Sequence, residues 1–119
     1  MPEKDVHLAQ AQHNRDFWGS IDLDTSSFLD WAVTGIFYEG VHWVEAYLSK
    51  YSFHSIDHGK RMRYMRQDVI LHPISGDMEQ LKFDSENARY QCHKYTKNNI
   101  NKDLIPKVDQ IKNHIQSVI

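Results

Sequence analysis

Residues 25–50 constrain the fold more than any other part of this chain. They read TSSFLDWAVTGIFYEGVHWVEAYLSK and contain no proline. Apolar residues recur there at the spacing of three and four that forms one stripe of a helix, namely Leu29, Val33, Ile36, Phe37, Gly40, Val44 and Leu48. A second row keeps helical spacing on roughly the opposite side, namely Trp31, Gly35, Tyr38, His42 and Ser49. Because a helix that is apolar on both sides is buried on both sides, we predict that this helix lies in the middle of a bundle.

Local start and stop signals place this helix and four others. Thr25, Ser26 or Ser27 can cap the central helix, with Asp30 near the positive end of its dipole. The other helices are predicted over residues 2–17, 58–71, 78–93 and 102–119, the last one starting at Lys102 or Leu104. No segment alternates as a strand does. The sequence therefore predicts an all-α, up-and-down bundle of four to five helices in one domain over residues 1–119.

Turn signals separate the later helices. We expect Ser55 or Asp57 to cap the third helix and the pair His72-Pro73 to end it, since the residue before proline avoids helical geometry. A turn around Gly76 and a break at residues 98–101 are predicted to follow. The inward positions of the last three helices are Met62, Met65 and Val69, then Met78, Leu81, Ala88 and Cys92, then Ile105, Val108, Ile111, Ile115 and Val118.

Composition excludes several classes of protein. A net charge of −2 over 119 residues argues against a strongly basic nucleic-acid binder. A single cysteine, Cys92, excludes an internal disulfide framework and favours a reducing compartment. The first ten residues have no apolar run, and the central helix carries Asp30, Glu39 and Glu45, so neither a secretory signal nor a membrane span is expected. We expect a soluble, cytoplasmic protein.

Eight histidines raise the question of a metal. Glu39 and His42 have the Glu-x-x-His spacing of di-iron bundles, but the sequence has that motif once, whereas such sites use it twice. A mononuclear site made of Glu39, His42, His54 and His58 is a weaker alternative to histidines at helix ends and in loops. We therefore expect no metal and no cofactor.

Arginine–histidine pairs offer a different chemistry. Arg89 and His93 are four residues apart on the predicted fourth helix, which would place them on one face. Arginine can hold a phosphate and histidine can move protons near neutral pH, which suffices for metal-free RNA cleavage by the 2′-hydroxyl. The Tyr90 ring would then stack on a base of the RNA strand, and the positive charge of Lys94 would contact its phosphates. The alternative interpretation is that Arg89 and His93 belong to a solvated helix surface, with the histidine capping the helix end. The same two interpretations apply to a second pair, Arg66 and His72.

The segment FYEGVHWVEAYLSKYSFHSIDHGKR resembles the HEPN (higher eukaryotes and prokaryotes nucleotide-binding) domain family. The residues that carry the resemblance are Phe37, Tyr38, Gly40, His42, Glu45, Ala46, Leu48 and His58. It covers residues 30–65 well and the rest of the chain only by helix order. The resemblance implies a bundle of four or five helices that forms a homodimer.

The resemblance also implies a function. Many members of the family are metal-independent endoribonucleases of toxin–antitoxin or other defence systems, and others are non-catalytic partners of nucleotidyltransferases. Their nuclease motif is an arginine, four to six residues and a histidine on a late helix, duplicated across the dimer. Here Arg89 and His93 are separated by three residues, one fewer than the family pattern. Both readings therefore stay open: a ribonuclease with Arg89 and His93 as catalytic residues and Tyr90 and Lys94 as substrate-binding residues, or a non-catalytic interaction module.

Overall fold

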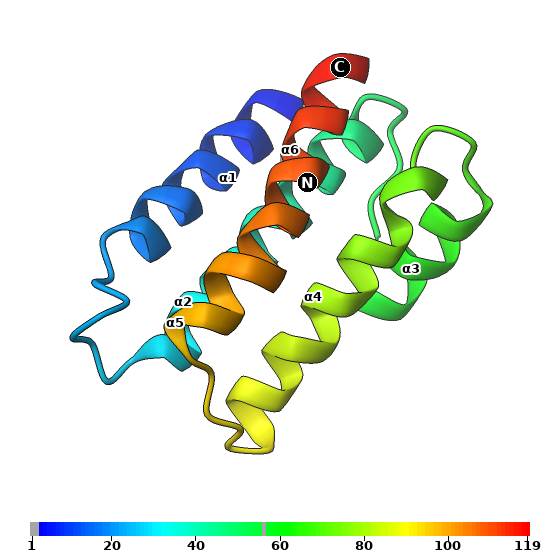
Figure 1. Ribbon diagram of the computed structural model, residues 1–119. Helices are drawn as coiled ribbons and strands as arrows, with labels where there is room; N and C mark the ends of the chain where they lie inside the picture. Colours follow the sequence, from blue (N-terminus) through cyan, green and yellow to red (C-terminus); the bar gives the residue numbers. More distant parts are fainter. Residues whose placement is uncertain (1–2, 56) are drawn as a thin grey trace.

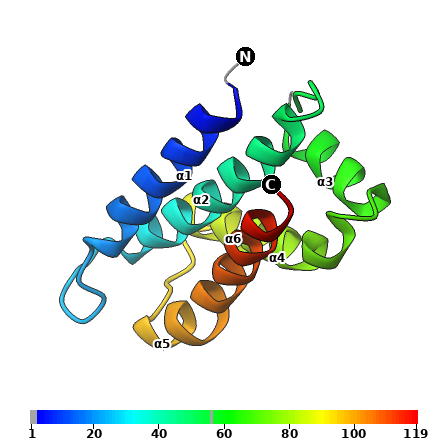
Figure 2. The same ribbon diagram turned by 90° about the horizontal axis from the view of Figure 1, so that it is seen from above.

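The central helix of the sequence analysis lies at the centre of the molecule. The computed structural model describes residues 3–55 and 57–119. In it α2 (Leu29–Ser49) is buried over most of its length and packs against α1 (Lys4–Gly19), α4 (His72–Tyr90) and α6 (Ile105–Val118). Figure 1 shows α1, α4 and α6 running roughly along one direction, and Figure 2 shows α2 between α1 on one side and α4 and α6 on the other.

The all-α prediction is confirmed for the part of the chain that the structure describes. α3 (His58–Gln67) packs on α4 at one end of the molecule, and α5 (Lys97–Asn99) and a π-helix (Ile100–Leu104) lead into α6. Buried side chains from all the longer helices form one hydrophobic cluster. No helix among the described residues is both long enough and apolar enough to cross a membrane.

The start of α2 differs from the prediction. No side chain caps its first turn, and the N-cap residue is Phe28 in place of Thr25, Ser26 or Ser27, so the helix begins at Leu29. The Ser26 hydroxyl instead accepts a hydrogen bond from the Phe28 backbone N–H at 3.0 Å, a local bond that competes with the helix. Asp30 does lie in the first turn, as expected.

The connection between α3 and α4 was predicted wrongly. The third helix ends at Gln67 because the Asp68 carboxylate accepts the backbone N–H groups of Ile70 and Leu71, which forms a tight turn. Pro73 therefore lies in the first turn of α4, where its missing N–H is tolerated, and does not end α3. Gly76 is consequently helical, and Val69, predicted to face inward, is 85% exposed. The predicted Asp57 cap and the burial of Met62 and Met65 are confirmed.

The last helical segment has no break at residues 98–101. Thr96 and Asn99 form a capping box that starts the helix at Lys97. Pro106 cannot donate the usual helical hydrogen bond, and the π-helix lies directly before it, with the Ile105 N–H bonded to the Ile100 carbonyl five residues back. The predicted burial is confirmed for Val108, Ile111 and Ile115, whereas Ile105 and Val118 are only partly buried. The predicted start of the first helix at Pro2 lies outside the described residues.

Candidate functional site

Arg89 lies in the last turn of α4 and is held there by two neighbours. Its Nη1 donates to the Tyr38 hydroxyl of α2 at 2.8 Å, its Nε donates to the Ser85 carbonyl at 3.2 Å, and its Nη2 donates to the Ser85 hydroxyl at 3.3 Å. A guanidinium has five N–H donors, so these contacts leave two without a partner among the described residues. The helix and the Tyr38 hydroxyl fix the group in one orientation.

Aromatic rings flank the same guanidinium. Its central carbon lies 5.4 Å from the ring centre of Tyr38 and 5.1 Å from that of Tyr90. No ion pair joins Arg89 to a carboxylate anywhere in residues 3–55 and 57–119. Its partners are all neutral, so its positive charge is available to an anion.

His93 does not share a helical face with Arg89, so that prediction is wrong. α4 ends at Tyr90, and the chain reverses through Cys92, whose φ of 55° is left-handed. The N–H groups of Gln91 and His93 both bond to the Asn87 carbonyl, which closes the end of the helix. Cys92, predicted to face inward, is consequently exposed. The four-residue spacing failed as a guide because the helix stops between the two residues.

The turn nevertheless brings His93 back to the same groove as Arg89. This groove, of about 560 Å³, is lined by Arg89, His93 and Lys94 on one side and by residues 26–31 on the other. The His93 ring contacts the Tyr95 ring edge-on, with ring centres 4.7 Å apart. The Tyr95 hydroxyl donates to Asp84 at 2.8 Å, and burial together with this bond raises the tyrosine pKa. Tyr95 thus anchors the turn that carries His93.

Of the four predicted site residues, Tyr90 lies apart. It does not line the groove that contains Arg89, His93 and Lys94. It lines a second, smaller hollow, of about 310 Å³, which Arg89 also borders. Its side chain is 71% exposed. Arg89 is therefore the only predicted site residue that lines both cavities.

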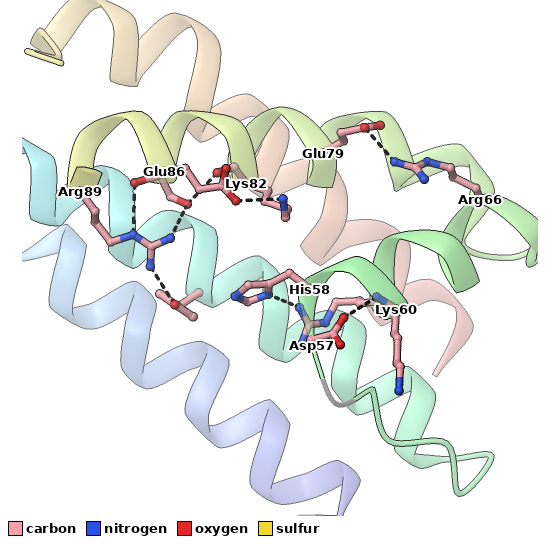
Figure 3. A network of polar contacts seen from close by, with 11 residues as sticks. Asp57, His58, Lys60, Arg66, Glu79, Lys82, Glu86 and Arg89 are labelled. Carbon is pink, nitrogen blue, oxygen red and sulfur yellow. Dashed lines mark hydrogen bonds and ion pairs between the residues drawn. The ribbon is translucent and has the colours of Figure 1, made fainter. Parts of the chain in front are cut away.

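His58 is a candidate site residue that sequence reasoning treated only as a family marker or a metal ligand. Its Nδ1 accepts a hydrogen bond from Arg61 Nη1 at 2.5 Å. Figure 3 shows His58 at the start of α3 and Arg89 at the end of α4. Burial lowers the His58 pKa, and the positive charges of Arg61, Lys82 and Arg89 lower it further, against the opposing effect of Glu86. The ring is therefore neutral at pH 7, with its proton on Nε2.

A buried ion pair fixes Arg61 and, through it, His58. Arg61 Nε lies 2.7 Å from a carboxylate oxygen of Glu45 on α2, and both side chains are buried. The Ser55 hydroxyl donates to the same carboxylate oxygen. Because the guanidinium can only donate, His58 Nδ1 must accept. No periodicity reveals this network, since it joins a loop and two helices.

Three residues of the metal hypothesis, Glu39, His42 and His58, have other partners. Glu39 accepts hydrogen bonds from Arg15, Trp18 and Trp43, and His42 Nδ1 lies 3.0 Å from His7 Nδ1. Within the described ranges, no three histidine, cysteine or acidic side chains gather so that they could hold a metal ion. The Glu39, His42, His54 and His58 ligand set is therefore not formed.

The second arginine–histidine pair is a surface contact. Arg66 forms an exposed ion pair with Glu79 at 2.8 Å (Figure 3). His72 Nδ1 donates to the Arg66 carbonyl at 3.1 Å and thereby helps to join α3 to α4. These contacts agree with the alternative interpretation, in which Arg66 and His72 belong to a solvated helix surface.

Comparison with known proteins identifies no relative. No protein-family model, no curated protein and no solved structure matches the chain. The function must therefore be argued from the site.

Proposed function

We propose that the chain is a HEPN-like, metal-independent endoribonuclease that acts as a homodimer. The observation that carries the proposal is that Arg89, which has no carboxylate partner among the described residues, lines one groove together with His93 and Lys94. A cation held by neutral groups favours an anionic ligand. Lys94 adds a second cation to the groove, and two cations in one groove favour a polyanion such as RNA.

The proposed reaction is an internal transfer of the phosphate. Arg89 holds the scissile phosphate, and the RNA 2′-oxygen forms a bond to phosphorus while the bond to the 5′-oxygen breaks. His93 takes the proton of the 2′-hydroxyl or supplies one to the leaving 5′-oxygen. Because one ring cannot do both at once, the dimer would bring a second His93 to the cleft. The products are a 2′,3′-cyclic phosphate and a 5′-hydroxyl.

Cleavage of a labelled single-stranded RNA in the presence of a chelator tests this proposal. We expect activity in the wild-type protein and a loss of about 100-fold or more in Arg89→Ala and His93→Ala, since a group that stabilises developing charge and a positioned acid–base group each contribute at least that much. Arg63→Ala and His13→Ala are matched controls, because both side chains are exposed and outside the groove. Absence of cleavage, or equal rates in all five proteins, contradicts the proposal.

The second candidate function is a non-catalytic HEPN-like interaction module. The exposure of Phe28 (62%) and Trp31 (51%) favours it, since neighbouring apolar side chains on a surface mark a protein contact. The partner would be a nucleotidyltransferase or an antitoxin-like protein, and the setting a toxin–antitoxin or defence system. Co-purification with a nucleotidyltransferase that is lost in Trp31→Ser, without RNA cleavage, would favour this module over the nuclease.

A further inference from the structure

The smaller hollow beside Arg89 has the dimensions and the lining of a subsite for one nucleotide. Its volume of about 310 Å³ is at the lower end of the range for small-molecule pockets. α2 contributes Tyr38, α3 contributes His58, and α4 contributes the remaining lining residues up to Tyr90, with Gln91 just beyond it. None of the proposed catalytic groups other than Arg89 lines it.

Two exposed aromatic rings border this hollow. Phe83 and Tyr90 are seven residues apart on α4, which is close to two helical turns, so they lie on one face. Their side chains are 57% and 71% exposed. Large exposed rings on one polar helix face supply stacking surfaces for a planar base.

The groups between the two rings match one base better than the others. Glu86 and Asn87 lie between Phe83 and Tyr90 in the sequence and line the same hollow. The Watson–Crick edge of guanine carries two adjacent N–H donors and a carbonyl acceptor, which suit a carboxylate and an amide N–H. Adenine and cytosine each offer one amino group beside an acceptor, and uracil offers one N–H. A carboxylate in this position therefore selects guanine.

The ion pair of Glu86 does not block this contact. Glu86 lies 2.9 Å from Lys82, one helical turn away (Figure 3), and both side chains are partly exposed. Such pairs contribute little to stability, and a carboxylate has acceptor sites beyond the one that Lys82 uses.

Two other lining residues of the hollow suit a phosphate. Arg89 supplies a positive charge, and His58, held through its Nδ1 by Arg61, supplies a neutral N–H donor at Nε2. In Figure 3 the ring nitrogen of His58 that does not contact Arg61 points to the side on which Arg89 lies. A neutral donor can bind a phosphate oxygen without the cost of burying a second charge.

We propose that this hollow binds a guanosine nucleotide, with the base between Phe83 and Tyr90 against Glu86, and the phosphate on Arg89 and His58. The inference rests on the proposed function in that the same Arg89 holds the phosphate of the RNA. It adds that a guanosine of the strand occupies the hollow next to the cleavage groove. The guanosine can be a residue of RNA or a free nucleotide, and the test separates the two.

Binding experiments on the full chain test the proposal. We expect the pentaribonucleotide UUGUU to bind at least about fivefold more tightly than UUAUU, UUCUU or UUUUU, the discrimination of one bidentate base contact. Guanosine 5′-monophosphate should bind better than the other three monophosphates. A free monophosphate that binds as tightly as UUGUU identifies the free nucleotide as the ligand, and a much weaker one identifies RNA.

Substitutions in the hollow locate the binding site. Phe83→Ala should weaken UUGUU binding by about 5- to 100-fold, the range of one lost stacking contact. Glu86→Gln should abolish the preference for guanine and leave UUAUU binding unchanged. Phe17→Ala and Glu79→Gln are the controls, because both side chains are exposed and neither lines the hollow. Thermal melts of each variant show whether it folds.

The outcomes separate this inference from the proposed function. His93→Ala should stop cleavage and leave the guanine preference intact, since His93 does not line the hollow. A guanine preference that depends on Phe83 and Glu86, without any cleavage, supports the subsite and contradicts the nuclease. Equal binding of all four pentanucleotides, or a preference that survives both substitutions, overturns the subsite, whatever the cleavage assay shows.

Discussion

Glu39 lies at the centre of a buried hydrogen-bond network. Its side chain is fully buried and accepts hydrogen bonds from Arg15 Nε at 2.9 Å, Trp18 Nε1 at 2.7 Å and Trp43 Nε1 at 2.8 Å. Arg15 also donates to Asp109 of α6 at 2.6 Å, so the network joins α1, α2 and α6. The buried charge of Glu39 is tolerated because it is fully paired, so the loss of either partner should lower the stability of the fold.

We therefore expect Glu39→Ala to lower the free energy of unfolding by about 3–5 kcal/mol, because it leaves two buried indole N–H groups without an acceptor and removes one of the two carboxylates paired with Arg15. Urea denaturation followed by circular dichroism measures the change. Glu79→Ala is the control, since its ion pair with Arg66 is exposed and should contribute at most about 1 kcal/mol. Equal losses in the two variants would contradict the assignment of a structural role to Glu39.

The facing rings of His7 and His42 make stability depend on pH. Their Nδ1 atoms lie 3.0 Å apart, an arrangement that needs one donor and one acceptor and so excludes two protonated rings. Burial lowers both pKa values. For His7 the positive charges of His54 and Arg61 lower the pKa further, for His42 those of His7 and Arg61 do so, and Glu45 raises both.

The fold therefore keeps both rings neutral at a pH where the unfolded chain already binds protons. We expect the free energy of unfolding to be constant above about pH 7 and to fall below the ordinary histidine pKa of about 6.5. His42→Gln should flatten this fall in thermal melts between pH 5 and pH 8, because one titrating ring is gone. The exposed His13→Ala control should keep the wild-type slope, and an unchanged slope in His42→Gln would refute the explanation.

At the scale of the element, the end of α4 positions the candidate site. Cys92 has a φ of 55°, which a residue with a Cβ atom adopts only at an energetic cost. That conformation lets the N–H group of His93 reach the Asn87 carbonyl and carries His93 to the groove. The strained residue therefore lies at the turn that places His93 in the groove of the proposed reaction.

Glycine at this position should relieve the strain. We expect Cys92→Gly to raise the free energy of unfolding by about 1 kcal/mol, the strain of a left-handed residue less the entropy that glycine adds to the unfolded chain. Gln91→Gly is the matched control, since its φ of −101° brings no relief and it should be neutral or destabilising. Chemical denaturation of both variants measures the difference, and destabilisation by Cys92→Gly would rule out strain at this turn.

At the scale of the whole molecule, the site is bordered by an apolar surface. Phe28 and Trp31, at the start of α2, line the groove that contains Arg89 and His93, and both are exposed. A second copy seated there would cover these rings and bring a second Arg89 and His93 to the cleft, as the proposed reaction requires.

We therefore expect a mass of about twice 14.1 kDa in light scattering at micromolar concentration. Trp31→Glu should shift the protein to the monomer, because it places a charge in the buried contact. Val69→Glu, which changes an exposed apolar residue away from the groove, should leave the mass unchanged. A monomeric wild-type protein would contradict the dimer.

The sequence by itself determined the helical class, the central place of α2 and most of the inward positions. Met62, Met65, Val108, Ile111 and Ile115 are buried as predicted. These properties follow from periodicity, which links residues three and four apart and needs no knowledge of the rest of the chain. The predicted helix boundaries were wrong where a side chain or a proline changed the local backbone hydrogen bonding, as at Asp68 and Pro106.

Only the tertiary structure decided what surrounds Arg89. Its hydroxyl partner Tyr38 is 51 residues away in the sequence, and the buried Arg61–Glu45 pair that fixes His58 spans 16. No spacing rule covers such contacts, because they form only when the core has brought α2, α3 and α4 together. The sequence singled out Arg89 and His93 for their chemistry. Because α4 ends between them, they do not share a helical face, and the turn after α4 brings them to one groove.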